Sequence, residues 1–185
     1  ISPFLPKQYE IEGLCFDHIV SHIPCLSEKT FLIIGTGQIG ANLVKILSSA
    51  QLRIYWCYHA QKPQKPISSS NIMVCKVKDI NRIIRNVDII ICATSAPEFI
   101  VKKSILQNID RNKKLYFFDL SVPRNIEPEI LHDYPTARLI DLDDLKKWHL
   151  EQNVQNVTKI LTKAKEIVIH HKYLYEKIAS SYKSR

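Results

Sequence analysis

Three of the four glycines in this 185-residue chain lie within six residues, at Gly35, Gly37 and Gly40, and this cluster constrains the fold more than any other feature. The motif GTGQIG follows a buried, strand-like run at residues 30–34 and leads into a segment at 41–49 that has the apolar spacing of a helix. A strand, a glycine turn and a helix in direct succession are typical of a dinucleotide-binding βαβ unit.

Each glycine of the motif has its own expected role. Gly35 permits the tight turn, Gly37 lets the backbone approach a pyrophosphate, and Gly40 lets the helix pack closely on the strand. The N-terminus of the helix also offers free N–H groups and the positive end of a dipole. We therefore expect a dinucleotide to be bound by the turn residues Gly35, Thr36, Gly37, Gln38, Ile39 and Gly40.

The remaining sequence alternates between strand-like and helix-like segments. Strands are expected at residues 53–58, 72–77, 88–93, 115–120 and 138–142, helices at 79–85, 96–108 and 127–132, and a proline- and serine-rich loop at 61–71. Parallel strands need crossover connections and are covered on both faces. The predicted fold class is α/β, a Rossmann-type doubly wound parallel sheet, with a flanking amino-terminal helix at 9–22 and a long carboxyl-terminal helix.

The net charge of +8 is distributed unevenly along the chain. Residues 29–78 contain seven basic residues and no acidic one, whereas residues 151–185 contain seven basic and three acidic residues. Basic surfaces attract the phosphates of cofactors and of nucleic acids alike. Because the first window surrounds the glycine cluster, it favours a phosphorylated ligand there. For the second window, a solvated helix face and a nucleic-acid-binding surface are both open.

The residues after the second strand indicate which dinucleotide binds. A site that prefers NAD usually has Asp or Glu about 20 residues after the glycine motif, where it holds the ribose 2′-hydroxyl. This chain has His59 there, followed by Gln61, Lys62 and Lys65. A carboxylate would repel a 2′-phosphate, whereas these side chains attract it. We therefore expect NADPH, the alternative being that the lysines are ordinary solvated loop residues.

Two further strand ends point to the same edge of the sheet, where ligands of open α/β sheets bind. The sequence TSAP (residues 94–97) follows one strand, and DLSVP (residues 119–123) ends another. The residues expected to line the nicotinamide side are Thr94, Ser95, Ala96, Asp119 and Pro123. Asp119 fits two roles, a general acid or base and a carboxylate that caps the following turn.

The last forty residues predict one long helix. Residues 143–185 contain neither Gly nor Pro, and an apolar seam recurs at alternating spacings of three and four. The seam consists of Val154, Val157, Leu161, Ala164, Val168, His171, Tyr175, Ile178 and Tyr182. We expect it to be buried against a second copy of the chain, as a homodimer, or against the helix at 9–22.

Several classes of protein are not indicated. The five cysteines include no CxxC pair, so neither a disulfide framework nor a zinc site is expected. No metal-ligand cluster, paired-carboxylate motif or Ser/His/Asp order is present. No apolar run approaches the roughly 18 to 20 residues that span a bilayer, and no signal peptide is recognisable. We expect a soluble, cytoplasmic protein without a membrane partner, and a fragment of a longer chain.

Four segments, in this order and spacing, resemble the NADPH-binding domain of glutamyl-tRNA reductase: GTGQIG, DIIICATSAPEFIV, FFDLSVPRNIEPEI and LIDLDDL. The resemblance covers residues 30–165, and VPRNIEPE and DLDDL are its most diagnostic parts. It implies a connecting segment and helix at 1–28, an NADPH-binding Rossmann domain at 29–143, and a long helix at 144–185 that starts the dimerisation region.

The resemblance also implies an activity. In that family a cysteine of an amino-terminal domain attacks the glutamyl ester of charged tRNA, and NADPH reduces the resulting thioester to glutamate-1-semialdehyde for tetrapyrrole and haem synthesis. Glutamyl-tRNA is then bound mainly by a domain that this chain lacks. None of the five cysteines has the family's Ser/Thr-Cys-Asn-Arg-like setting, so no catalytic residue is carried over and the chain alone should be inactive.

The chain departs from the family pattern at two places. It has Tyr58-His59-Ala60-Gln61-Lys62 where an Asn-Arg-Thr-like run and a helix are usual, and Gln38 where Glu is frequent. Two other functions remain as alternatives: a precorrin-2 dehydrogenase-like enzyme of sirohaem synthesis, and a non-catalytic dinucleotide-binding dimerisation module.

Overall fold

The computed structural model describes residues 10–63 and 70–183. Residue contacts divide the chain between Lys146 and Lys147 into two units. The first unit contains a sheet with its flanking helices and the start of a long helix, and the second unit contains the remainder of that helix.

The described residues of the first unit form a six-stranded, wholly parallel sheet in the order β3-β2-β1-β4-β5-β6. The strands are β1 (Thr30–Ile34), β2 (Arg53–Tyr58), β3 (Ile72–Lys76), β4 (Ile89–Cys92), β5 (Tyr116–Asp119) and β6 (Arg138–Asp141). Every residue of β1, β4 and β5 is buried, as expected of strands that are covered on both faces. The strand order reverses between β1 and β4, where open α/β sheets bind their ligands.

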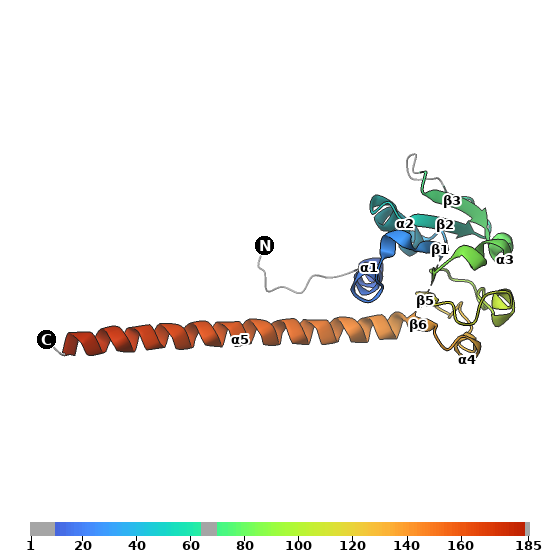
Figure 1. Ribbon diagram of the computed structural model, residues 1–185. Coiled ribbons are helices and arrows are strands. Elements are labelled where there is room, and N and C mark those ends of the chain that lie inside the picture. Colours follow the sequence, from blue (N-terminus) through green and yellow to red (C-terminus); the bar gives the residue numbers. More distant parts are fainter. Residues whose placement is uncertain (1–9, 64–69, 184–185) are drawn as a thin grey trace. The chain divides into compact units, whose positions relative to one another are not determined.

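Helices cover both faces of this sheet (Figure 1). Ile19 of α1 and Leu43 of α2 are fully buried in the core on one face, and Leu106 of η4 and Ile130 of α4 are buried in the core on the other. The helices and 3-10 turns are α1 (Ile11–His22), η1 (Leu26–Glu28), α2 (Gln38–Ser49), η2 (Val77–Asp79), α3 (Ile80–Ile83), η3 (Ile84–Asn86), η4 (Lys103–Leu106) and α4 (Ile130–Asp133). The predicted Rossmann-type doubly wound parallel sheet, with its amino-terminal helix, is confirmed.

The predicted helix at 96–108 is wrong. Only Lys103–Leu106 form a helical turn, and Val101 instead makes a parallel bridge with Ile126. The N–H groups of Ile100 and Val101 both donate to the carbonyl oxygen of Asn125, at 2.8 and 3.0 Å. The apolar spacing within the segment was real, since Leu106 is buried, but its backbone hydrogen bonds go to a distant turn, which overrides helical periodicity.

The long helix α5 (Leu142–Lys183) was predicted correctly. Its first turn is fixed by two aspartates that cap each other's backbone: Asp141 Oδ1 accepts from the N–H groups of Asp143 and Asp144 at 2.9 and 3.0 Å, and Asp144 Oδ2 accepts from the N–H of Asp141 at 3.1 Å. This reciprocal arrangement is a capping box, and it explains the DLDDL segment physically.

The apolar seam of α5 is exposed on the helix. Val154, Val157, Leu161 and Val168 expose 66%, 56%, 56% and 66% of their surface. The side chains of Tyr175, Ile178 and Tyr182, which the sequence also places on the seam, lie outside the described side chains. Among the described residues, no helix combines the length and the apolar character needed to cross a membrane.

Candidate dinucleotide-binding site

The three glycines of the turn are required for different reasons. Gly35 has φ +122°, and a Cβ there would lie 2.1 Å from the carbonyl oxygen of Ala93; a Cβ on Gly40 would lie 2.4 Å from the carbonyl oxygen of Gly35. Gly37 has an ordinary φ of −69°, and a Cβ there would meet no atom within 4 Å. The fold therefore requires glycine at 35 and 40, whereas glycine at 37 leaves open space beside the backbone.

The turn is held by hydrogen bonds from two neighbouring strands. The N–H of Gly35 donates to the carbonyl oxygen of Cys57 at 3.1 Å, and the indole Nε1–H of Trp56 donates to the carbonyl oxygen of Gly35 at 2.9 Å. The N–H of Ala93 donates to the carbonyl oxygen of Ile34 at 2.8 Å. Trp56 is a residue that the sequence reasoning missed, although a buried indole N–H generally needs an acceptor.

The N-terminus of α2 lies directly after this turn. Gly37 is the N-cap residue and no side chain caps it, so the first N–H groups of the helix are left to bind a ligand at the positive end of the helix dipole. Gln38 Nε2 donates to Asn42 Oδ1 at 3.3 Å, and Asn42 Nδ2 donates to Glu12 of α1. The motif is thereby connected to the amino-terminal helix.

Glu12 is another residue that the sequence reasoning missed. It is only 6% exposed although it carries a carboxylate. Burial raises the pKa of Glu12, but its hydrogen bonds, first among them the one from Asn42, outweigh burial and bring the pKa below its ordinary value. Glu12 is thus a charged partner for Asn42 between α1 and α2.

The expected adenosine side lies beyond the end of β2. His59 and Lys62 are exposed there, with Gln61 between them, whereas Lys65 lies outside the described residues. The strand register adds a residue that the sequence reasoning did not select: Lys76, at the end of β3, is exposed and pairs with Tyr58, the last residue of β2. The sequence pointed to this region through the window at 29–78 that contains no acidic residue. Only the strand register, however, shows that Lys76 lies beside the end of β2.

The expected nicotinamide side is formed by the loops after β4 and β5, which are joined by hydrogen bonds. The N–H of Thr94 donates to Ser121 Oγ at 3.1 Å, and the hydroxyl oxygen of Thr94 accepts from the N–H of Ala96 at 3.0 Å. Ser95 and Pro123 are exposed beside them. The structure thus brings together the two loops that the sequence selected, while His59 and Lys62 follow a different strand.

Asn125 links these two loops. It is fully buried, and its Oδ1 accepts from the hydroxyl of Thr94. Its Nδ2 donates to the carbonyl oxygens of Ala96 and Glu98 at 2.9 and 3.0 Å. Every polar group of its side chain is therefore used, and the residue fixes the path of the chain after Thr94.

Asp119 organises the second loop from within. It is 2% exposed, and its carboxylate accepts hydrogen bonds from the N–H groups of Ser121, Asn125 and Ile126 at 3.2, 2.8 and 2.9 Å. Of the two roles that the sequence left open, this geometry agrees with the capping carboxylate, because the oxygens face backbone N–H groups inside the turn.

Two other features do not form a site. In the described part of the chain, no group of three or more His, Cys, Asp and Glu side chains is placed to hold a metal ion.

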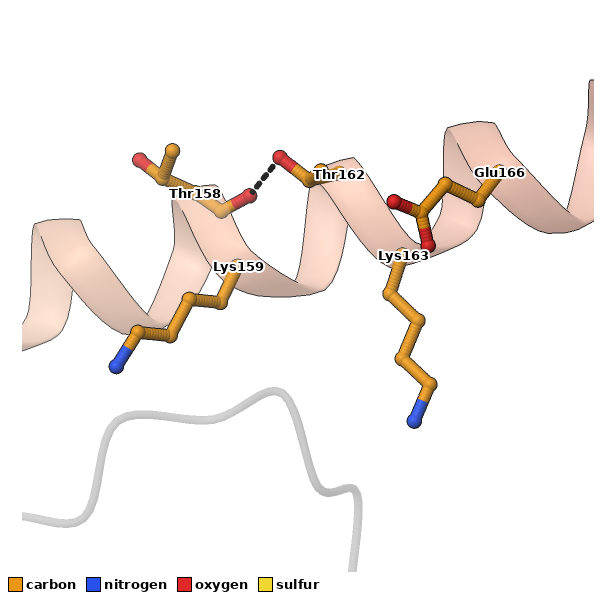
Figure 2. Close-up of a pocket in the computed structure, with 5 residues that line it drawn as sticks. All are labelled: Thr158, Lys159, Thr162, Lys163 and Glu166. Carbon is orange, nitrogen blue, oxygen red and sulfur yellow. Dashed lines mark hydrogen bonds between the residues drawn. The ribbon is translucent and has the colours of Figure 1, made fainter.

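Figure 2 shows a hollow along α5, where the lining residues are Thr158, Lys159, Thr162, Lys163 and Glu166. All five are exposed on this one helix, and the Thr162 hydroxyl donates to the Thr158 carbonyl oxygen at 3.0 Å. This is the pattern of a solvated helix face.

Known proteins match most of the chain. The family described as Shikimate / quinate 5-dehydrogenase matches residues 18–148. A glutamyl-tRNA reductase from Christiangramia forsetii is 30% identical over 155 residues, which cover 82% of this chain and 36% of that protein. The chain thus spans little more than a third of the length of this relative. These matches favour the reductase resemblance over the sirohaem alternative.

Solved structures have the same fold. Glutamyl-tRNA reductase from Methanopyrus kandleri superposes with a TM-score of 0.61 at 17% identity, over 82% of this chain and 40% of that one. The nucleotide-binding domain of glutamyl-tRNA reductase from Thermoplasma volcanium has a TM-score of 0.55 at 18% identity, over 80% of this chain and 97% of that one. The second match therefore covers nearly the whole of the solved nucleotide-binding domain.

Proposed function

The chain belongs to the shikimate / quinate 5-dehydrogenase family, and we propose that it is the NADPH-binding part of a glutamyl-tRNA reductase, the kind of protein that it resembles over 82% of its length. The observation that carries the proposal is Gly37, where the absent side chain leaves open space at the uncapped N-terminus of α2. Neither the backbone angle nor the packing of the chain requires glycine there. A pyrophosphate that lies against the backbone supplies the reason.

The predicted site residues divide into three groups in this proposal, all within a cofactor domain at 29–143. The turn residues Gly35, Thr36, Gly37, Gln38, Ile39 and Gly40 hold the pyrophosphate. His59 and Lys62 lie near the adenosine 2′-phosphate, and Thr94, Ser95, Ala96 and Pro123 border the nicotinamide. Asp119 acts indirectly, because it holds the turn that carries Ser121 and Pro123.

The preference for NADPH is argued from charge. The chain has no acidic residue between Lys29 and Lys78, so no carboxylate from this window competes for the ribose at the end of β2. Exposed Lys62 and Lys76 flank the strand end, and an ammonium group binds a phosphate dianion more strongly than a hydroxyl. NADH lacks that phosphate and loses this interaction.

The contribution of this chain to the reaction is to bind and orient. Bound NADPH supplies the hydride that reduces a glutamyl thioester to glutamate-1-semialdehyde in the reductases it resembles. The network of Thr94, Ser121 and Asn125 keeps the two nicotinamide-side loops in fixed relation. Because both loops are joined by hydrogen bonds before a ligand binds, little ordering is needed on binding.

The nucleophile is supplied from outside this chain in the proposal. Burial raises the pKa of Cys15 and of Cys92, and both thiols are fully buried. A thiol in such surroundings is not a thiolate at neutral pH and does not attack an ester. The other three cysteines, like these two, lack the Ser/Thr-Cys-Asn-Arg-like setting of the family's nucleophile, so we expect the chain alone to bind the cofactor without reducing glutamyl-tRNA.

We further propose that the carboxyl-terminal helix pairs two copies of the chain. Four seam residues, Val154, Val157, Leu161 and Val168, each expose more than half of their surface, and a continuous apolar stripe of this kind is usually covered by a partner helix. We also propose a cytoplasmic location, where charged tRNA is available. Sedimentation of the chain and of a version truncated after Leu150 tests the pairing. If both versions sediment as monomers, the pairing is contradicted.

One reconstitution tests the proposed enzyme. The chain is joined to the amino-terminal domain of a glutamyl-tRNA reductase relative, and semialdehyde formation from glutamyl-tRNA and NADPH is measured, with Gly37→Asp as the matched variant that cannot bind pyrophosphate. We expect activity in the fusion and none in the variant or in the chain alone. Oxidation of precorrin-2 instead would transfer the assignment to the sirohaem alternative. NADPH binding that changes the association of the helices without any turnover would favour the dimerisation module.

A further inference from the structure

Cys57 and Cys75 face each other across two neighbouring strands. They are register partners in β2 and β3, and their sulfur atoms are 2.8 Å apart. Both thiols are free in the structure. Since the two sulfurs of a disulfide lie about 2.0 Å apart, the pair needs to close by less than about 1 Å to form one.

The two thiols differ in access and in acidity. Cys57 is fully buried, whereas Cys75 is half-buried on a strand at the edge of the sheet. The hydrogen bond with Cys57 lowers the pKa of Cys75, while the same contact and burial raise the pKa of Cys57. Cys75 is therefore the sulfur that an oxidant meets first, and Cys57 is the one that follows.

We propose that Cys57 and Cys75 are an oxidisable dithiol site, which hydrogen peroxide converts to a disulfide. The Cys75 thiolate attacks the peroxide, so that an S–O bond forms, the O–O bond breaks and water leaves after protonation. The Cys57 sulfur then attacks the Cys75 sulfur; the S–S bond forms, the S–O bond breaks, and the released hydroxide takes the Cys57 proton as a second water. Two thiols lose two electrons and one peroxide is reduced.

This site lies beside the glycine turn. The carbonyl oxygen of Cys57 accepts the N–H of Gly35 at 3.1 Å, and the preceding residue, Trp56, holds the Gly35 carbonyl oxygen. A disulfide that draws β2 toward β3 at Cys57 therefore acts on the residue that positions the turn. We expect oxidation to weaken NADPH binding about fivefold, a shift of about 1 kcal/mol. Only this last statement rests on the proposed function.

The experiment treats the reduced chain with hydrogen peroxide and measures intact mass, followed by peptide mapping without reductant. We expect a loss of two hydrogens, a linked pair of peptides that contain Cys57 and Cys75, and reversal by dithiothreitol. In Cys57→Ala, Cys75 should stop at a sulfenic acid that dimedone captures. In Cys75→Ser, Cys57 should stay reduced, since it is buried.

Cys25 supplies the matched control, because it is an exposed cysteine outside the pair. Cys25→Ser should form the same linked peptides at the same rate. The proposal would be overturned if, after peroxide treatment and denaturation, Cys57 and Cys75 both still react with an added alkylating reagent. Equal NADPH affinity of the reduced and oxidised forms would overturn the link to the turn. Absence of NADPH binding in both forms would count against the proposed function, and the linked peptides would still decide the dithiol site.

Discussion

The indole nitrogen of Trp56 donates a 2.9 Å hydrogen bond to the carbonyl oxygen of Gly35, so a side chain of β2 orients the turn that follows β1. The same oxygen would lie 2.4 Å from a Cβ on Gly40. The Gly35 carbonyl oxygen therefore lies between the indole donor of Trp56 on β2 and the backbone of Gly40 on α2. The shape of the turn depends on both residues.

Removal of the indole donor is expected to loosen the turn. Trp56→Phe keeps an aromatic ring in the core but leaves the Gly35 carbonyl oxygen unpaired, at a cost of about 1 kcal/mol, or about fivefold in NADPH affinity. Calorimetric titration measures the change. Tyr55→Phe, on the adjacent position of β2 and the opposite face, is the control and should bind as the unsubstituted chain does.

Gly37→Ala separates binding from folding. A Cβ at Gly37 meets no protein atom, whereas one at Gly40 meets the Gly35 carbonyl oxygen at 2.4 Å. We expect Gly37→Ala to keep its melting temperature and lose NADPH affinity by about tenfold or more, because the methyl group occupies the space of the pyrophosphate. Gly40→Ala should lower the melting temperature. Unchanged NADPH affinity in Gly37→Ala would contradict the placement of the pyrophosphate.

Lys76 is expected to contribute to the choice of cofactor. Its register partner is Tyr58, the last residue of β2, so Lys76→Gln removes a positive charge beside the expected 2′-phosphate. NADPH affinity should fall by about fivefold, or about 1 kcal/mol, which is the upper end for a solvent-exposed ion pair, while NADH affinity stays constant. Lys29→Gln removes the same charge before β1, at the opposite end of the strands, and should change neither affinity.

His18 gives the domain a specific pH dependence. Burial and, to a smaller extent, the nearby His22 lower the pKa of His18 to about 4, although Asp144 opposes the shift. The unfolded chain keeps the ordinary pKa of 6.5 and takes up the proton first, so the free energy of unfolding should fall as the pH is lowered from 6.5 through 4. His18→Gln should flatten this part of the profile in denaturant titrations. His132→Gln, a change at an exposed histidine, should leave the profile unchanged. Equal slopes of unfolding free energy against pH in the unsubstituted chain and in both variants would refute the assignment.

Local patterns in the sequence were sufficient for the strands, the glycine turn and the long helix. They were sufficient because each depends on neighbours in the chain: the buried run at 30–34, the glycines at 35 and 40, and the unbroken seam after 143. The helix expected at 96–108 failed for the opposite reason. Asn125, 29 residues from Ala96, takes the hydrogen bonds of that segment, and no local spacing encodes such a partner.

The candidate site was predictable to the same extent. The two loops at 94–96 and 119–123 could be placed at one edge of the sheet because parallel strands end together. Trp56, Glu12 and Lys76 could not be selected, since their roles follow from a cross-strand contact, a helix-to-helix contact and a strand register. Each is a relationship between elements, which appears only when the sheet is assembled.

The central claim is that this chain binds a phosphorylated dinucleotide at the glycine turn. Calorimetric titration of the purified chain with NADPH and with NADH tests it most directly. The account predicts one NADPH bound per chain, with an affinity at least about tenfold higher than for NADH, a difference of about 1.4 kcal/mol. Equal affinity for the two dinucleotides would contradict the role given to Lys62 and Lys76, and absence of binding to either would contradict the site itself.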